Sequence, residues 1–189
     1  ITAAGNDGQG DTDDVEFAAS VIAQGRISLA AGQIALTSSV NVVGPGAALL
    51  TNDANEASRV FSINAGVQAT ISGLTISGGG NVTAGGGVHN LGDLTLDSIV
   101  VTGNHTILTS AGTNVGGGIY SDTNLGAQST TIINSTVSGN SAASRGGGVF
   151  NADGRVDIKH STITNNSTTT TGAGSGVASF GNVATTLTS

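Results

Sequence analysis

The sequence predicts an all-β fold, a right-handed parallel β-helix (a β-solenoid) of roughly six or seven coils. The first observation behind this prediction is a repeated phrase: GGGVHN, GGGIYS and GGGVFN begin at Gly85, Gly116 and Gly146, and a weaker GSGVAS begins at Gly174. The second is a set of short segments in which aliphatic residues alternate with Thr and Ser. The third is the composition, with 31 Gly and only 9% charged and 3% aromatic residues, which disfavours helices.

Residues 1–25 are expected to form a cap or entry segment, and residues 26–189 one continuous solenoid domain. A solenoid needs a cover over its open core and its unpaired strand edge. The segment 11–24, DTDDVEFAASVIAQ, is a candidate for this cover as a short helix with Asp14 at its N-cap.

Residues 26–46 continue the alternating pattern less regularly. The GPG at 44–46 predicts a turn, and TNDANEASR at 51–59 is interpreted as a loop. The inward-facing positions predicted from the alternation are Ile27, Leu29, Ile34, Leu36, Val40 and Val42.

The segments between the glycine phrases align so that aliphatic residues fall into three rows. Alternation with a period of two predicts strands of about three to five residues whose aliphatic side chains point inward. Parallel crossovers are overwhelmingly right-handed, which gives the predicted hand. The rows are Ile71, Leu96, Ile132 and Ile158; Ile76, Val101, Val137 and Ile163; and Val88, Ile119, Val149 and Val177.

The glycine phrases are predicted to lie where the chain turns a corner and coils crowd together. Glycine loses the most backbone freedom on folding, so a run of three indicates places where nothing larger fits. Asn104, Asn140 and Asn166 fall together after the second aliphatic row. We expect them to form a turn ladder with hydrogen bonds between their amides.

Composition excludes several classes of partner. The formal net charge is -7 with only 5 Lys and Arg, whereas phosphate binding needs a basic patch, so no nucleic-acid partner is expected. No apolar stretch approaches the roughly 20 residues of a membrane helix, so the chain is not expected to be transmembrane. Cysteine is absent, and a sequence that starts at Ile1 without any Met suggests a processed or trimmed product, for which a removed export signal is one explanation. The extracellular or cell-surface location that we expect is what the resemblance described next implies.

Several segments together resemble those of a known group of proteins. They are GPGAALLT at 44–51, SRVFSI at 58–63, ATISGLTISGG at 69–79 and the GGG[VI]x[NS] phrases. In this order they resemble the bacterial secreted right-handed parallel β-helix proteins with polymorphic-outer-membrane-protein-like, adhesin-like repeats. The resemblance implies export and surface display as a stalk, passenger or adhesin, and it implies no particular ligand.

Candidate catalytic and metal-binding groups are few. Polysaccharide-cleaving β-helices need paired carboxylates, or acids that hold Ca²⁺. The acids here do not recur in one row, the alternating charges of 153–159 are interpreted as a solvated strand, and the acidic segment 6–14 lacks the EF-hand order. We therefore predict no catalytic residue, no metal site and no cofactor. The acids of the repeat region are Asp93, Asp97, Asp122, Asp153 and Asp157.

Two outward rows are candidate contact surfaces. In the first, His89, Tyr120 and Phe150 follow the inward row at the glycine phrases. These rings could receive a sugar face or a partner's apolar surface, or they could simply stack between coils. The second is an array of Thr and Ser on neighbouring strands, including Thr136, Thr162 and Thr164; similar arrays occur in ice-binding solenoids, although β-propensity alone explains outward Thr.

The leading functional hypothesis is an extracellular, non-enzymatic structural or adhesive solenoid. Its expected partners are copies of itself, a surface polysaccharide, or the surface of a host or neighbouring cell. If Ser189 is the natural terminus, an uncapped last coil is an edge that templates end-to-end or lateral assembly, and non-closing contacts give filaments. The alternatives are a carbohydrate-binding or polysaccharide-degrading β-helix and an ice-binding solenoid.

Overall fold

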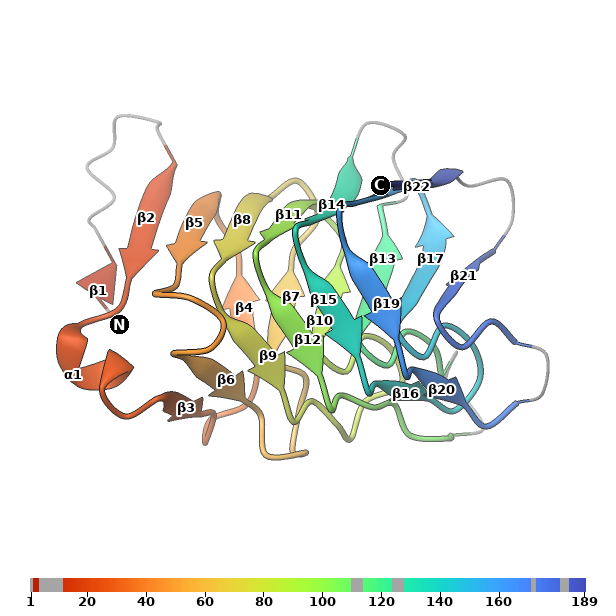
Figure 1. Cartoon of the computed structure of the whole chain (residues 1–189), viewed down its shortest axis with the longest axis horizontal. Coiled ribbons are helices and arrows are strands. Elements are labelled where there is room, and N and C mark those ends of the chain that lie inside the picture. The colour runs from red at the N-terminus through yellow and green to blue at the C-terminus, as the bar shows by residue number, and fades with distance from the viewer. Residues whose placement is uncertain (1, 4–11, 110–113, 124–127, 171–172, 181–183) are drawn as a thin grey trace.

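The computed structural model describes residues 2–3, 12–109, 114–123, 128–170, 173–180 and 184–189. The chain is almost all β, and its parallel sheets stack as a solenoid of about 6 turns, which confirms the predicted fold class. The turns follow one another along the long axis of the molecule, from the N-terminal strands at one end to the C-terminal strands at the other (Figure 1).

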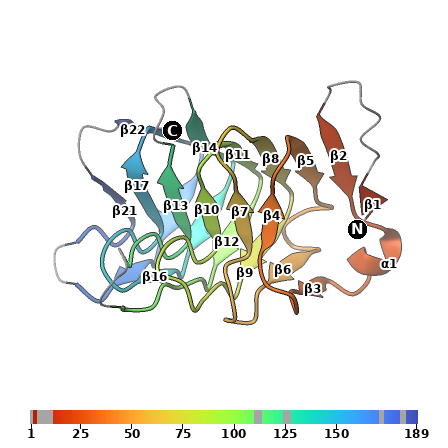
Figure 2. The ribbon, with the colours of Figure 1, turned by 180° about the vertical axis from the view of Figure 1, so that it is seen from behind.

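Three long sheets form the walls of the solenoid, and Figure 2 shows them from behind. Sheet A contains β1 (Thr2–Ala3), β2 (Asp13–Glu16), β5 (Val40–Val43), β8 (Gln68–Ser72), β11 (Asp93–Asp97), β14 (Ser129–Ile133), β18 (Arg155–Lys159) and β22 (Ala184–Thr188). Sheet B contains β3 (Arg26–Ser28), β6 (Thr51–Asp53), β9 (Thr75–Ser77), β12 (Val100–Thr102), β15 (Thr136–Ser138) and β19 (Thr162–Thr164). Sheet C contains β4 (Ile34–Leu36), β7 (Phe61–Ile63), β10 (Val88–Asn90), β13 (Ile119–Asp122), β17 (Val149–Asp153) and β21 (Val177–Ser179).

Strand register confirms the three aliphatic rows. Leu96 of β11 lies opposite both Ile71 and Ile132, and the rows in sheets B and C pair in the same way. The six inward positions predicted between residues 27 and 42 all lie in the core or pack against it. In the last coils a fourth, short sheet pairs β16 (Ser141–Ala142) with β20 (Ser167–Thr168).

The glycine phrases lie where neighbouring turns touch backbone to backbone. The first glycine of each phrase, such as Gly116 with a φ of 64°, takes the left-handed conformation that L side chains rarely adopt. A Cβ atom on Gly86 would lie 2.5 Å from the carbonyl oxygen of Gly117 and 2.6 Å from that of His105. At the third position, a Cβ atom on Gly118 would lie 2.6 Å from the carbonyl oxygen of Gly148, so the prediction that nothing larger fits is confirmed for all three glycines of the GGG phrases.

The predicted asparagine ladder is also confirmed. The Oδ1 atom of Asn140 accepts hydrogen bonds from the backbone N–H and the side-chain amide of Asn104, at 3.0 and 2.9 Å. Asn140 in turn donates from its backbone and its amide to Oδ1 of Asn166, both at 3.0 Å. Asn104 and Asn140 are almost fully buried, so these bonds satisfy amides that have no access to water.

The N-terminal segment differs from the prediction of a helix over 11–24 with Asp14 at its N-cap. Residues 13–16 form strand β2, which pairs with β5, and the only helix of the described chain is α1 (Ala19–Ile22), preceded by Ala18 at its N-cap. The physical reason is the alternation of DDVEF, which places Val15 and Phe17 against the core. Sheet pairing and this burial outweigh the local capping signal.

The interpretation of 51–59 as a loop is wrong for its first three residues. They form β6, which pairs with β3 and β9 and places Asn52 in the inward row beside Ile76. Asn52 is 1% exposed, and neither atom of its amide has a hydrogen-bond partner among the described residues. Alternation did not predict this strand, because a polar residue stands at an inward position of a row that is otherwise aliphatic.

Candidate functional site

His89, Tyr120 and Phe150 form one stacked column, here called the ring column. They occupy equivalent positions on β10, β13 and β17. The ring centroids of His89 and Tyr120 are 4.9 Å apart with an interplanar angle of 13°, and those of Tyr120 and Phe150 are 6.1 Å apart at 8°. The chain therefore brings together three rings that lie about one solenoid turn apart in the sequence.

The ring column lies outside the main core but is largely covered. Tyr120 is 9% exposed and Phe150 is 5% exposed, and both pack with Ala84 and Val115 in a second, smaller hydrophobic cluster. Val115 pairs by isolated bridges with its counterparts in the turns on either side. Little of the ring surface of Tyr120 and Phe150 is therefore accessible to a partner.

The electrostatics of the column follow from its burial. The pKa of His89 is lowered to about 4, chiefly by burial and also by the nearby Arg59 charge, while the Asp122 charge opposes the shift. Burial also raises the pKa of the Tyr120 phenol, whose hydroxyl donates a 3.0 Å hydrogen bond to Asp122. At neutral pH both rings are therefore uncharged, which suits a stacked apolar column.

Lowering the pH from 7 to 4 is expected to destabilise the protein through His89. The unfolded chain binds a proton near the ordinary histidine pKa of about 6.5, whereas the folded chain binds it only near pH 4. Stability is thus complete above about pH 6.5 and falls as the pH drops toward 4, by about 2 kcal/mol after allowance for the partial exposure of the ring. Urea unfolding at a series of pH values measures this loss.

The variant His89→Phe should remove this part of the pH dependence, because a phenyl ring keeps the stack and cannot be protonated. His160→Gln is the matched control, since His160 lies at the exposed turn after β18 and leaves the ring column intact. Equal slopes of stability against pH in the wild type and in His89→Phe would contradict the assignment.

Thr136, Thr162 and Thr164 lie on the outer face of sheet B. Thr136 and Thr162 share a column with Thr75 and Val100, while Thr164 belongs to the adjacent column of Ser and Thr. At the N-terminal end of this face, Arg26 forms a 3.0 Å ion pair with Asp53 across the two columns. The array is regular over the last strands of the sheet and is interrupted by the valine and by this ion pair.

The acidic residues do not converge on one site. Asp93 accepts hydrogen bonds from the backbone and the hydroxyl of Ser129. Asp157 is 5% exposed between Arg155, at 2.9 Å, and Lys159, at 3.9 Å, so the interpretation of 153–159 as a solvated strand is wrong at this residue. Its carboxylate is buried because both cations flank it on the same strand.

Within the described ranges, no group of three or more His, Asp or Glu residues is placed to hold a metal ion. The acidic segment 6–14 lies mostly outside the described residues; of its acids, Asp14 accepts a 2.8 Å hydrogen bond from Asn41. Among the same described residues, no helix is long and apolar enough to cross a membrane.

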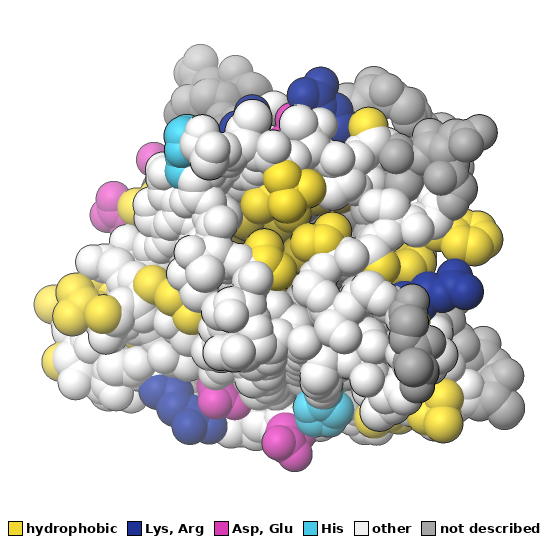
Figure 3. Space-filling model, turned by 45° about the vertical axis from the view of Figure 1, so that its right-hand side comes forward, with side chains coloured by type: hydrophobic (Ala, Val, Ile, Leu, Met, Phe, Trp, Pro, Cys, Tyr) yellow, Lys and Arg dark blue, Asp and Glu magenta, His cyan; other side chains and the backbone are white. Residues whose placement is uncertain are grey.

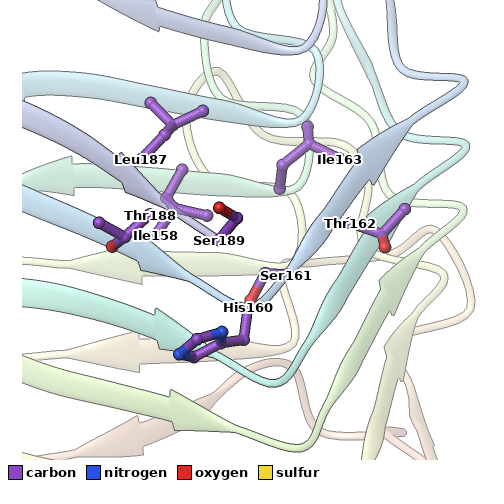
Figure 4. Close-up of a pocket in the computed structure, with 8 residues that line it drawn as sticks. All are labelled: Ile158, His160, Ser161, Thr162, Ile163, Leu187, Thr188 and Ser189. Carbon is purple, nitrogen blue, oxygen red and sulfur yellow. The ribbon is translucent and has the colours of Figure 1, made fainter.

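The last described turn leaves the interior of the solenoid open. Strands β19, β21 and β22 stand last in sheets B, C and A. Between β19 and β22 lies a hollow of about 630 Å³ lined by Ile158, Ile163 and Leu187 together with the turn at His160 and Ser161 (Figure 4). Leu187 is 64% exposed, and hydrophobic side chains gather in the middle of this end in Figure 3.

A smaller hollow beside the ring column was not predicted from the sequence. It measures about 200 Å³ and is lined chiefly by Tyr120, Phe150, Phe180 and Arg145. The Arg145 guanidinium lies over the Phe180 ring, 5.9 Å from its centroid. These two residues belong to no repeated row. Val115 occupies the position of Arg145 in the preceding turn, and Leu91, Asp122 and Ala152 follow the earlier glycine phrases where Phe180 follows the last. No pattern in the sequence joins them.

Comparison with protein-family models, with curated proteins and with solved structures finds no match to this chain.

Proposed function

We propose that the chain is an extracellular, non-enzymatic structural and adhesive β-solenoid of a bacterial cell surface, which assembles through the open end of its last described turn. The observation that carries the proposal is the apolar hollow of about 630 Å³ at that end, lined by Ile158, Ile163 and Leu187, of which Leu187 is 64% exposed. An exposed strand edge next to apolar side chains favours pairing with another strand.

The occupant of this end, in our proposal, is a second copy of the chain. The two ends of the solenoid differ, since β1 pairs antiparallel to β2 at the N-terminal edge of sheet A and Val21 of α1 packs against the core. At the N-terminal end β3 and β4 remain edge strands of sheets B and C, so this end is only partly covered, and its difference from the open end disfavours head-to-tail stacking. Contact between two open ends is isologous and closes after two copies, so it gives a discrete pair instead of a filament.

The sides of the solenoid supply the adhesive surface in this proposal. The outer faces of sheets A and B present Thr, Ser and Asn in columns, such as Thr70 beside Thr95 and Thr131. Hydroxyl and amide groups at regular spacing suit hydrogen bonding to a surface polysaccharide or to the surface of a neighbouring cell. The resemblance to secreted adhesin-like repeat proteins supports the same assignment.

Sedimentation of the purified chain over a range of concentrations tests the assembly. We expect monomers at low micromolar concentration and pairs at about a hundred micromolar, as for a small, partly apolar interface. Leu187→Lys places a charge at the mouth of the hollow and should prevent pairing at every concentration, because the buried charge would have no partner.

The matched control is Leu49→Lys, which makes the same change at a leucine that is 54% exposed, in the turn before β6. It should pair like the wild type. Monomers at all concentrations, or pairing that survives Leu187→Lys, would overturn assembly through the open end. Filaments in electron micrographs would overturn the isologous arrangement.

A further inference from the structure

The ring column ends at Phe150, which also lines the smaller hollow. In the turn after Phe150 the equivalent position is Ala178, so Phe150 has a ring partner on one side only among the described residues. Phe180, two residues further along the chain, is 60% exposed and forms the outer wall. The hollow thus combines the ring of Phe150 with a second, more accessible ring.

The lining of this hollow is mainly apolar. Val115 and Ala152 complete the wall beside Tyr120 and Phe150, and the whole space measures about 200 Å³. Drug-sized ligands occupy pockets of roughly 300–1,000 Å³, so this one has room for a single ring with a short substituent. Apolar walls favour an aromatic ring over a sugar, whose hydroxyls would be left without partners.

Arg145 is the one basic residue among the described residues that line the hollow. Arg145 is exposed and forms no ion pair with any described residue, whereas Arg26, Arg155 and Lys159 each pair with an aspartate. Arg59 also lacks an ion pair in the described chain, but it is partly buried and donates to the carbonyl oxygen of Ala84 at 3.3 Å. The planar fork of the exposed Arg145 guanidinium matches a carboxylate in a bidentate manner. Asp122 is engaged by the Tyr120 hydroxyl, so the ligand's anionic end is expected beside Arg145 and away from Asp122.

We propose that this hollow binds a small aromatic carboxylate, with its ring against Phe150 and Phe180 and its carboxylate at Arg145. Ring stacking and charge-assisted hydrogen bonding then act on the two ends of one molecule. None of these residues lines the open end of the solenoid, so this proposal is independent of the proposed assembly.

Titration of the full chain with benzoate, followed by backbone amide shifts in NMR spectra, tests the proposal. We expect saturable shifts around Phe150 and Phe180 with a dissociation constant of about a millimolar, since the ligand is small. Benzamide, which has nearly the same shape without the charge, should bind about tenfold more weakly. Glucuronate, which has the charge without the apolar ring, should bind about tenfold more weakly as well.

Two variants separate the roles of charge and ring. Arg145→Gln should reduce the preference for benzoate over benzamide from about tenfold to about one. Phe180→Ala should weaken both ligands by a similar factor, because it removes a wall and no charge. Arg26→Gln, which removes one positive charge at an exposed arginine of sheet B, is the control and should leave both affinities unchanged.

The proposal is overturned if benzoate causes no saturable shifts near Phe150 and Phe180, or if glucuronate binds as tightly as benzoate. It is also overturned if Arg145→Gln leaves the preference for benzoate intact while the variant's spectrum shows that it is folded.

Discussion

Replacing Gly117 with alanine is expected to lower the free energy of unfolding by about 3 kcal/mol. A Cβ atom at this position would meet the backbone oxygen of Ser141 and would lie 2.6 Å from that of Gly147. The backbone of the neighbouring turn cannot move away from this Cβ atom without breaking the strand pairing between the two turns. Thermal or urea unfolding followed by circular dichroism measures the loss.

The last and weaker glycine phrase, at 174–179, contains the control. A Cβ atom on Gly176 would make only an ordinary contact, 3.6 Å from a methyl group of Ile163, so Gly176→Ala should change stability by no more than about 0.5 kcal/mol. The chain supports this distinction, since the position equivalent to Gly117 in the last described turn is Ser175. Similar losses in the two alanine variants would show that glycine is required here for some reason other than crowding.

Replacing Asn140 with alanine is expected to cost about 3 kcal/mol of unfolding free energy. Its Oδ1 atom accepts two hydrogen bonds from Asn104, and its amide donates to Val101, Ser138 and Asn166. All of these groups lie in or beside the closed interior, where a lost partner leaves a desolvated polar group unpaired. The unfolding transition of the variant compared with that of the wild type gives the value.

The control for this prediction is Asn41→Ala. Asn41 makes one exposed side-chain hydrogen bond, to Asp14, so the same substitution there should cost at most about 0.5 kcal/mol. If Asn140→Ala is no more costly than Asn41→Ala, the ladder does not stabilise the fold.

Most of the solenoid could be predicted because its signals repeat. The rows that contain Leu96, Val101 and Ile119 recur in every turn after residue 68, and repetition distinguishes an inward position from chance alternation. The same holds for Asn140 and its ladder. The first turns could not be predicted as well, because Asn52 interrupts its row and Val15 stands beside a run of acids that also suits a helix start.

Only those residues of the candidate sites that recur from turn to turn could be predicted from the sequence. The alignment placed Tyr120 between His89 and Phe150, yet it gave no information on the neighbouring turns that cover these rings. Arg145 and Phe180 meet although neither residue type recurs at the equivalent positions of the other turns. Contacts between unrepeated residues depend on three-dimensional geometry, and a pattern in one sequence has no means of showing them.

The asparagine ladder and the ring column each run through only three turns of the solenoid. The aliphatic rows by themselves make neighbouring turns interchangeable, so a strand could pair with the turn after its proper partner at little cost. Such a displacement of the turn that contains Asn104 and Tyr120 would set Tyr120 against Ala178 in place of Phe150. It would also set Asn104 against Asn166 and leave Asn140 outside the ladder. The ring column, which ends at Phe150, therefore distinguishes these turns where the aliphatic rows do not, and it favours a single order of turns.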